Sequence, residues 1–308
     1  MPDRTKPEFV TNPEPIDLVY TWVDGADSVH REMVANYGIT KKQRNPERFR
    51  DFFDLLKYSL RSLELYAPWI NHVHLVTARP QVPMWLNLDS DRVSIHFHDE
   101  IIPADYLPTF SSRTIESYLH MIPHLSEKFI YMNDDFLFGS PIQRSDFFTK
   151  NGQMKIYGTL MGETLKMVKD DIFYDLTSKL QHLPRLINKK IYCQMEKDWE
   201  RKLSVTRSHK FRSRGDVIPH TLYRYFALSQ FGDECYAPSL SHYRKLYSFH
   251  KIMNDLNEEQ KKLWELTKRK PKFICFNDDQ KENPNQQVVG LIQEFLESNY
   301  SDKSSFEN

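Results

Sequence analysis

Two acidic turns draw attention because each follows directly on a stretch with the character of a buried strand. Residues 133–135 (Asn-Asp-Asp) follow the run 128–132, and residues 277–279 (Asn-Asp-Asp) follow the run 272–276. Adjacent carboxylates delivered by a strand suit a hard divalent cation, since Mg²⁺ takes oxygen ligands from one or two carboxylates plus substrate phosphates. The expected metal ligands are Asp134, Asp135, Asn277 and Asp278. A solvated turn, which Asn and Asp favour anyway, is the alternative.

A basic run at residues 209–216 is a second candidate for chemistry. It contains Arg212 and Arg214 and ends at Asp216. The planar guanidinium fork matches phosphate oxygens, so the run is a plausible clamp for a diphosphate. Taken alone, the run favours a solvated basic loop slightly over the clamp. Farther back in the chain, His182 is a candidate general base, although a lone histidine is more often structural.

Two further sites are candidates for contacts to a polar ligand. The expected helix start at residues 111–113 offers Ser111, Ser112 and Arg113. Ordinary helix capping is the alternative there. Asp24 follows the first expected strand and stands in a turn with Gly25.

The elements that must position these residues alternate between strands and helices. Expected strands are 16–23, 72–78, 93–98, 128–132 and 272–276. Expected helices are 47–66, 111–121, 172–190, 217–231, 254–269 and 285–298. This alternation predicts an α/β sheet with crossover helices, in which ligands bind outside the carboxyl ends of the strands.

The chain is expected to form one catalytic domain over residues 16–300. Residues 16–150 and 271–300 make its α/β core, and residues 151–270 make a largely helical insertion. The proline-rich residues 1–15 are expected to be a flexible lead-in, and residues 301–308 a flexible tail.

Composition excludes several classes of protein. Lys plus Arg and Asp plus Glu are both 42, so nothing in the charge supports a nucleic-acid partner. The three cysteines are scattered and predict no disulfide framework or zinc site.

The sequence contains no run of about 18 apolar residues that would predict a transmembrane helix, and no signal peptide is expected. A cytoplasmic protein is therefore expected, with a Golgi-lumen catalytic fragment as the alternative. Phosphate-binding loops of the Walker type, dinucleotide fingerprints and serine-hydrolase elbows are missing from the sequence.

Taken together, four blocks in order resemble the Stealth family of sugar-1-phosphate transferases. That family includes bacterial capsule-polysaccharide enzymes and the catalytic subunit of the animal N-acetylglucosamine-1-phosphotransferase. The blocks are residues 16–27 (IDLVYTWVDGAD), residues 49–139, residues 182–184 with 208–228, and residues 272–278 (KFICFND). The resemblance runs from residue 16 to about residue 300. The fold expected is a mostly parallel, Rossmann-like sheet similar to that of glycosyltransferase-A enzymes.

The resemblance implies a reaction. A nucleotide-diphosphate sugar, UDP-N-acetylglucosamine by analogy with the family, gives up its whole sugar-1-phosphate to a hydroxyl of a glycan, and UMP leaves. It further implies that Mg²⁺ or Mn²⁺ is held on the diphosphate by Asp134, Asp135, Asn277 and Asp278. Arg212, or Arg214 as the nearby alternative, would hold the phosphoryl oxygens, and His182 would take the acceptor proton. Asp216 would orient His182 or an arginine, and the donor contacts would come from Asp24, Ser111, Ser112 and Arg113.

Two other functions remain open at this point. A metal-dependent glycosyltransferase would release UDP instead of UMP, and a binding protein that keeps the fold would turn over no donor. The identity of the acceptor and a homo-oligomeric state are also left open by the sequence.

Overall fold

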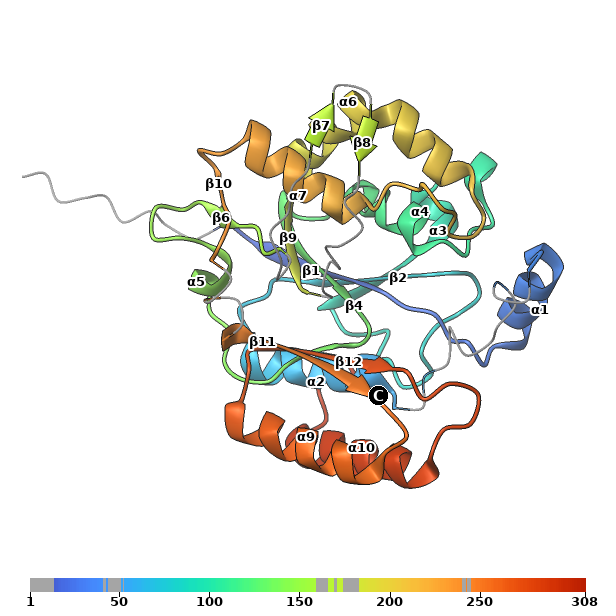
Figure 1. The fold of residues 1–308 in the computed structure, drawn as a ribbon, viewed down its shortest axis with the longest axis vertical. Coiled ribbons are helices and arrows are strands. Elements are labelled where there is room, and N and C mark those ends of the chain that lie inside the picture. Colours follow the sequence, from blue (N-terminus) through green and yellow to red (C-terminus); the bar gives the residue numbers. More distant parts are fainter. Residues whose placement is uncertain are drawn as a thin grey trace, which may run out of the picture.

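The computed structural model describes residues 14–40, 43, 51, 53–158, 166–168, 171–173, 183–239, 242 and 245–308. Its centre is a five-stranded sheet in the order β3-β2-β1-β4-β9 (Figure 1). The strands are β1 (Ile16–Thr21), β2 (Val73–Thr77), β3 (Val93–Phe97), β4 (Lys128–Asn133) and β9 (Arg185–Asn188). The first four strands are mutually parallel, and β9 runs antiparallel to β4. The predicted α/β class with a mostly parallel sheet is confirmed.

Helices cover both faces of this sheet, which is why β1, β2 and β4 are nearly continuous apolar runs. Figure 1 shows α4, α6 and α7 on one side and α2 on the other. These helices are α2 (Leu55–Tyr66), α4 (Ser112–Glu116), α6 (Lys189–Ser208) and α7 (Pro219–Gln230). The buried side chains of both layers form one large hydrophobic cluster around the sheet.

A second, three-stranded sheet has the order β11-β12-β5. It consists of β11 (Tyr247–Ile252), β12 (Phe273–Asp278) and β5 (Phe136–Phe138). β11 and β12 are parallel, and β5 is antiparallel to β12. Two helices, α9 (Leu256–Arg269) and α10 (Gln286–Asn299), pack against it in a separate hydrophobic cluster.

The chain passes from one sheet to the other within two residues, and this passage positions the site. β4 ends at Asn133, and β5 begins at Phe136. Because β5 is antiparallel to β12, Phe136 at the start of β5 lies opposite Cys275 in the middle of β12. The backbone N–H of Phe276 donates to the carbonyl oxygen of Asp135 at 2.8 Å. The turn after β4 is thereby held next to the end of β12.

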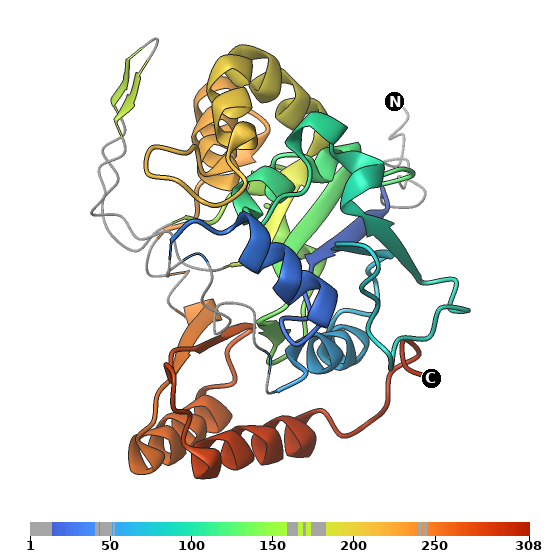
Figure 2. The ribbon, with the colours of Figure 1, turned by 90° about the vertical axis from the view of Figure 1, so that its right-hand side faces the viewer.

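The remaining described elements are short or lie at the periphery. They are α1 (Ser28–Tyr37), α3 (His98–Ile101), the 3-10 turns η2 (Ala104–Tyr106) and η3 (Leu119–Met121), α5 (Arg144–Phe147), β6 (Met154–Lys155), β7 (Lys166–Val168), β8 (Asp171–Phe173) and β10 (Cys235–Tyr236). Figure 2 shows α1 in front of the central sheet and the β7–β8 hairpin projecting from the body.

Residues 151–270 contain α6, α7 and α9, but they also supply β9 to the central sheet and β11 to the second sheet. The helix predicted over residues 172–190 is wrong in its described part, because β8 and β9 stand there. Asn188 explains the boundary, since its side-chain oxygen accepts from the N–H of Ile191 and begins α6. The predicted helix over 111–121 is broken into α4 and η3.

The prediction of a flexible tail over residues 301–308 is wrong. Phe306 is fully buried, and the Arg61 guanidinium donates to both carboxylate oxygens of Glu307 at 2.9 Å. The N–H of Asn308 also donates to the carbonyl oxygen of Trp85. An apolar anchor and a forked ion pair therefore hold the segment on the body. Residues 1–13 of the predicted lead-in lie outside the described residues.

Candidate active site

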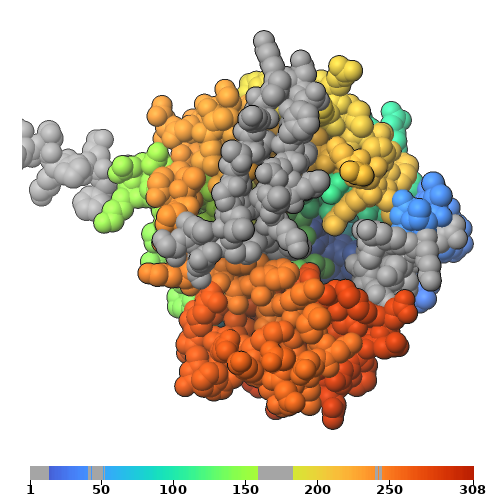
Figure 3. Space-filling model, viewed as in Figure 1, coloured from blue at the N-terminus to red at the C-terminus, as the bar shows by residue number. Residues whose placement is uncertain are grey.

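A cavity of about 540 Å³ lies at the carboxyl ends of the parallel strands. Figure 3 shows the molecule hollowed between the α6–α7 part and the α9–α10 part. The lining comes from the ends of β1, β2, β4 and β12, from α1 and α3, and from the loops before α4 and α7. Its polar lining residues are Thr21, His30, Asp51, Arg79, His98, Asp99, Thr109, Ser112, Asn133, Asp134, Asp135, Arg212, Asn277 and Asp278.

One wall of the cavity is acidic. It contains all four predicted metal ligands, Asp134, Asp135, Asn277 and Asp278, together with Asn133 and Asp51. The passage between the two sheets brings them together, because the turn after β4 meets the end of β12. The predicted roles of these residues stay predictions, but the two acidic turns do share one cavity.

The charge on this wall is largely uncompensated at Asp134. Burial, followed by the neighbouring negative charges of Asp135 and Asp51, raises the pKa of Asp134 well above its usual value. A carboxylate in such surroundings gains from any cation that enters the cavity. The buried thiol of Cys275 donates to Oδ2 of Asp135 at 3.3 Å, a contact that fixes Asp135 without adding positive charge.

The chemistry of these oxygen donors fits a hard divalent cation that is only partly caged by protein. No group of three or more His, Cys, Asp or Glu side chains in the described ranges is arranged to hold a metal ion. The acidic wall offers carboxylate and amide oxygens, which are the ligands that Mg²⁺ takes together with waters and substrate phosphates.

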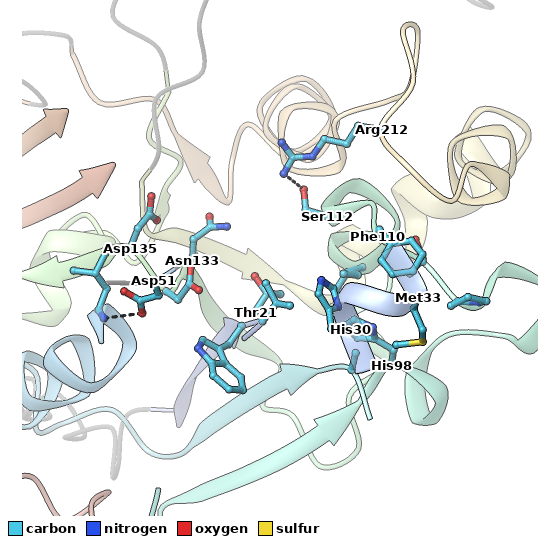
Figure 4. Close-up of a pocket in the computed structure, with 18 of the residues that line it drawn as sticks. Thr21, His30, Met33, Asp51, His98, Phe110, Ser112, Asn133, Asp135 and Arg212 are labelled. Atoms are coloured by element: carbon cyan, nitrogen blue, oxygen red, sulfur yellow. Dashed lines mark hydrogen bonds between the residues drawn. The ribbon is translucent and has the colours of Figure 1, made fainter. Parts of the chain in front are cut away.

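Arg212 and Ser112 lie on another side of the same cavity. The Arg212 guanidinium Nη2 donates to the Ser112 hydroxyl, and the Arg212 residue is exposed. In the view of Figure 4 the pair stands between the acidic group and a group formed by His30, Met33, His98 and Phe110. The cavity therefore offers an anionic wall, a guanidinium and an apolar, imidazole-bearing end.

Other predicted site residues do not line the cavity. The Asp24 carboxylate accepts the N–H of Ala26 at 2.7 Å within its own turn. Ser111 is fully buried, and Arg214 is exposed on the loop before α7. His182 lies outside the described residues.

Asp216 and Arg113 hold the loop that carries Arg212. The buried Asp216 carboxylate contacts His209 Nδ1 at 2.6 Å, accepts the N–H of Ser213 at 2.7 Å, and pairs with Arg113 at 3.4 Å. Arg113 also donates to the carbonyl oxygen of Ser213 at 2.8 Å. Asp216, predicted to act in catalysis, is thus placed as an anchor of the loop.

Glu116 is a buried carboxylate close to the cavity lining. Burial pushes the pKa of Glu116 upward, but the charge and hydrogen bond of His220, together with Arg185 and Arg212, lower that pKa to about 2. Glu116 Oε2 lies 2.8 Å from His220 Nδ1, and Tyr131 links Glu116 to Thr21 of the lining through distances of 3.5 and 3.1 Å. The network therefore holds a buried negative charge that interacts with Arg212.

Sequence reasoning missed several lining residues. Asp51 was read as part of the helix 47–66, although its carboxylate accepts the N–H groups of Phe53 and Leu55 at the start of α2. His98 closes the expected strand 93–98, so its place at a strand end was a usable signal. His30 and Met33 belong to α1, for which no apolar stripe was visible.

Comparison with protein-family models places four conserved regions on the chain in order. Stealth protein CR1, conserved region 1, matches residues 14–41, and CR2, conserved region 2, matches residues 48–156. CR3, conserved region 3, matches residues 181–229, and CR4, conserved region 4, matches residues 265–308. Together these regions cover most of the chain.

Curated relatives carry phosphotransferase names. The exopolysaccharide phosphotransferase SCO6023 of Streptomyces coelicolor is 36% identical over 69% of this chain and 40% of its own length. The exopolysaccharide phosphotransferase cps2G of Lactiplantibacillus plantarum is 44% identical over 48% of this chain and 43% of its own length. The capsular polysaccharide phosphotransferase SacB of Neisseria meningitidis serogroup A is 31% identical over 95% of this chain and 57% of its own length. The chain therefore spans about half the length of these relatives.

Among solved structures, the chain is similar to the glycosyltransferase GlyE of Streptococcus pneumoniae. The identity is 10% and the TM-score 0.46, over 93% of this chain and 62% of that chain. The galactosyltransferase LgtC is 12% identical with a TM-score of 0.42, over 92% of this chain and 96% of that one. In the described part of the chain, no helix has the length and apolar character that crossing a membrane requires.

Proposed function

The chain belongs to the Stealth family, and we propose that it transfers a sugar-1-phosphate from a nucleotide-diphosphate sugar to a hydroxyl group of a glycan. The proposed donor is UDP-N-acetylglucosamine, the product is a phosphodiester, and UMP is released. The polysaccharide phosphotransferase names of the relatives support the transfer of a sugar phosphate to a glycan.

One observation carries the proposal: an acidic wall built from two distant turns shares a single cavity with Arg212. Phosphoryl transfer needs charge neutralisation and alignment more than covalent help from the protein. An anionic wall suits a cation that bridges diphosphate oxygens, and a guanidinium suits the oxygens of the group in transit.

The cation would be held by Asp134, Asp135 and Asp278, with the side-chain oxygen of Asn277. When bound, a divalent ion supplies neutralisation of the charge on the diphosphate. The raised pKa of Asp134 supports this assignment, since it reflects burial and the neighbouring charges of Asp135 and Asp51, which a bound cation would offset. Arg212, oriented by Ser112, would bind the oxygens of the transferred phosphoryl group.

In the proposed reaction the acceptor oxygen attacks the phosphorus on the sugar side of the diphosphate. A new P–O bond forms to the acceptor, and the P–O bond to UMP breaks. The acceptor hydroxyl loses its proton to His182, which precedes β9 in the sequence. His182→Ala should lower kcat by roughly 10²- to 10⁴-fold, the usual contribution of a general base, and leave donor affinity unchanged.

Product analysis is the direct test. The protein is incubated with UDP-N-acetylglucosamine, Mg²⁺ and a panel of simple glycans, and the products are examined by mass spectrometry and phosphorus NMR. UMP together with a phosphodiester resonance supports the proposal. UDP together with a glycosidic product identifies a glycosyltransferase instead, and no turnover with any nucleotide sugar favours a binding protein.

The cation has its own test. EDTA should abolish transfer, and added Mg²⁺ or Mn²⁺ should restore it. Full activity in the chelator contradicts the cation while leaving the UMP result untouched, so the two parts of the proposal are judged separately.

A further inference from the structure

Helix α1 rests on a small hydrophobic cluster of its own. This cluster consists of Val34, Phe110 and Phe211, with Met33 packed against it, and it is separate from the two large clusters of the sheets. The rings of Phe110 and Phe211 are stacked, with centroids 4.9 Å apart and planes at 18°. His30 of α1 meets the Phe110 ring edge-on at 5.8 Å. Helix α1 therefore packs on the stacked pair.

The same pair joins two loops that are far apart in the sequence. Phe110 belongs to the loop before α4, and Phe211 to the loop before α7. The N–H of Phe110 donates to the carbonyl oxygen of Lys210 at 2.7 Å, and Lys210 Nζ donates to the carbonyl oxygen of Leu107 at 2.6 Å. Farther along, Arg113 donates to the carbonyl oxygen of Ser213 at 2.8 Å. These bonds flank the aromatic stack on both sides.

Arg212 directly follows Phe211, and the two side chains face opposite environments. Phe211 is 6% exposed within the cluster, whereas Arg212 is exposed and lines the cavity. A long arginine side chain has considerable rotamer freedom, so the path of its backbone decides where the guanidinium can reach. Burial of Phe211 against Phe110 fixes that path one residue before the arginine.

We propose that Phe211, stacked on Phe110 beneath α1, is a positioning residue that holds Arg212 at the phosphate-binding side of the cavity. The proposal rests on the proposed function only for the role of Arg212. It adds that α1, through Val34 and Met33, packs on the stack, so that the α1 side of the cavity and the position of the guanidinium depend on the same contact. Phe211 itself lies outside the cavity lining.

Kinetics of Phe211 variants test this role. Phe211→Leu keeps an apolar side chain but removes the stacked ring, and it should lower kcat/KM for sugar-phosphate transfer by roughly 10- to 100-fold, the order expected when a reacting group shifts by about 1 Å. Phe211→Tyr keeps the ring and should retain activity within about two- to three-fold. A matched control is Phe306→Leu, the same change at a fully buried phenylalanine of the C-terminal segment, which should leave kcat/KM unchanged.

A double-mutant cycle separates positioning from general loss of structure. Arg212→Lys keeps the charge but loses the guanidinium fork. If Phe211 acts through Arg212, Phe211→Leu should cost much less in the Arg212→Lys background than in the wild type. An equal loss in both backgrounds overturns the positioning role, as does full activity of Phe211→Leu. Full activity of Arg212→Lys, by contrast, contradicts the proposed phosphate role of the arginine fork.

Thermal unfolding of each variant shows whether the protein is folded under the assay conditions. If Phe211→Leu does not fold, Val34→Ala takes its place in the cycle, because it loosens the same cluster from the side of α1. Val34→Ala should then lower kcat/KM by a few-fold in the wild type and by less in the Arg212→Lys background. Equal losses in both backgrounds overturn the proposal in this form too.

Discussion

Two carboxylates at opposite ends of neighbouring strands show how differently one sheet can treat the same side chain. Asp17 is the second residue of β1, and Asp134 directly follows the last residue of β4. β1 and β4 are parallel and in register from Ile16 opposite Lys128 to Thr21 opposite Asn133. Both carboxylates therefore belong to the same layer, but they lie at its two opposite edges.

Asp17 is fully partnered by the chain. It accepts the N–H of Ser126 at 2.7 Å and the amide of Asn71 at 2.8 Å, and it lies 3.3 Å from His74 Nε2. Burial alone would raise its pKa, but the hydrogen bonds of His74, Asn71 and Ser126 lower the pKa to about 2. His74 in turn contacts His96 at 2.9 Å, so the hydrogen-bonded network continues into a buried pair of histidines.

Asp134 has the opposite balance. Burial and the carboxylates of Asp135 and Asp51 raise its pKa, and the hydrogen bonds from backbone N–H groups do not offset them. A buried carboxylate that serves the fold brings its compensation with it, whereas one that serves a ligand leaves the compensation to the ligand. This difference is what we expect if the proposed site lies at the carboxyl ends of the strands.

Replacement of Asp134 should give the largest effect on activity. Asp134→Asn keeps the shape of the side chain and removes its charge, so the wall loses the anion proposed to hold the cation. We expect transfer to fall by about 10³-fold or more. We also expect no loss of stability, because an uncompensated buried charge disappears. Steady-state kinetics and urea unfolding measure the two quantities on the same sample.

Asp279→Asn is the matched control for this change. Asp279 also follows β12, but it pairs with Lys251 and Lys281 and does not line the cavity. It should keep nearly full activity. Equal losses in the Asp279 and Asp134 variants would show that the activity responds to any charge change near this edge, and the contrast drawn here would then fail.

Replacement of Asp17 should reverse the pattern. Asp17→Ala leaves the N–H of Ser126, the amide of Asn71 and the imidazole of His74 without their buried partner. Breaking such a set costs about 3 kcal/mol in the free energy of unfolding. The folded fraction should retain kcat within a few-fold when assayed well below the unfolding temperature. A stable Asp17→Ala protein with low activity would contradict the division of labour between the two edges.

The contributions of the two carboxylates to stability should depend on pH in opposite directions. The pKa of Asp17 falls from 3.8 to about 2 on folding, so its contribution is fully present above pH 3.8 and is lost as the pH falls toward 2. The stability deficit of Asp17→Ala should therefore shrink by about 2 kcal/mol across that window. The pKa of His96 is lowered from 6.5 to about 4, so His96 changes stability at higher pH and does not interfere with this measurement.

Asp134 should behave in the opposite way. Its pKa is raised on folding, so its ionisation costs stability as the pH rises above 3.8. Any gain in stability of Asp134→Asn should be present at neutral pH and should vanish as the pH falls below 3.8, because there the unfolded chain binds the proton as well and the two states no longer differ in protonation. Urea unfolding at a series of pH values measures both variants. If the gain in stability persists at low pH, it comes from packing rather than from charge.

Strand ends were the part of the site that sequence could predict. Residues 133–135 and 277–279 follow apolar, β-branched runs, and parallel strands present their carboxyl ends at one edge, so the acidic wall was expected there. The actual reason the two turns meet was not visible. The passage from β4 to β5 takes only two residues, and no local pattern announces that a strand leaves one sheet and begins another.

Helix α1 and the C-terminal segment show a second limit. Only His30 and Val34 are buried in α1, so no apolar periodicity announces a helix that lines the cavity. The segment 301–308 is short and mostly polar. The buried Phe306 and the ion pair between Arg61 and Glu307 hold it in place. The positions of α1 and of residues 301–308 depend on contacts with distant parts of the chain. A local sequence pattern does not reveal such contacts.

Asp135 stands between the two extremes and gives the smallest expected effect. Cys275, fully buried in β12, donates its thiol to Asp135 Oδ2 at 3.3 Å. A thiol is a weak, neutral donor, so this contact orients the carboxylate without adding positive charge, unlike the imidazole and amide donors around Asp17. Loss of this contact should cost about 0.5–1 kcal/mol in binding, which is a two- to five-fold change.

Cys275→Ala should therefore raise the Mg²⁺ concentration that gives half-maximal transfer by about two- to five-fold, with kcat little changed. Cys275→Ser restores a small donor at the same place and should return that concentration toward the wild-type value. Cys235→Ala, at a buried cysteine of β10, is the control for loss of a thiol elsewhere. If the Ala and Ser variants at position 275 respond alike, the effect comes from packing in β12, and Asp135 needs no donor to keep its position.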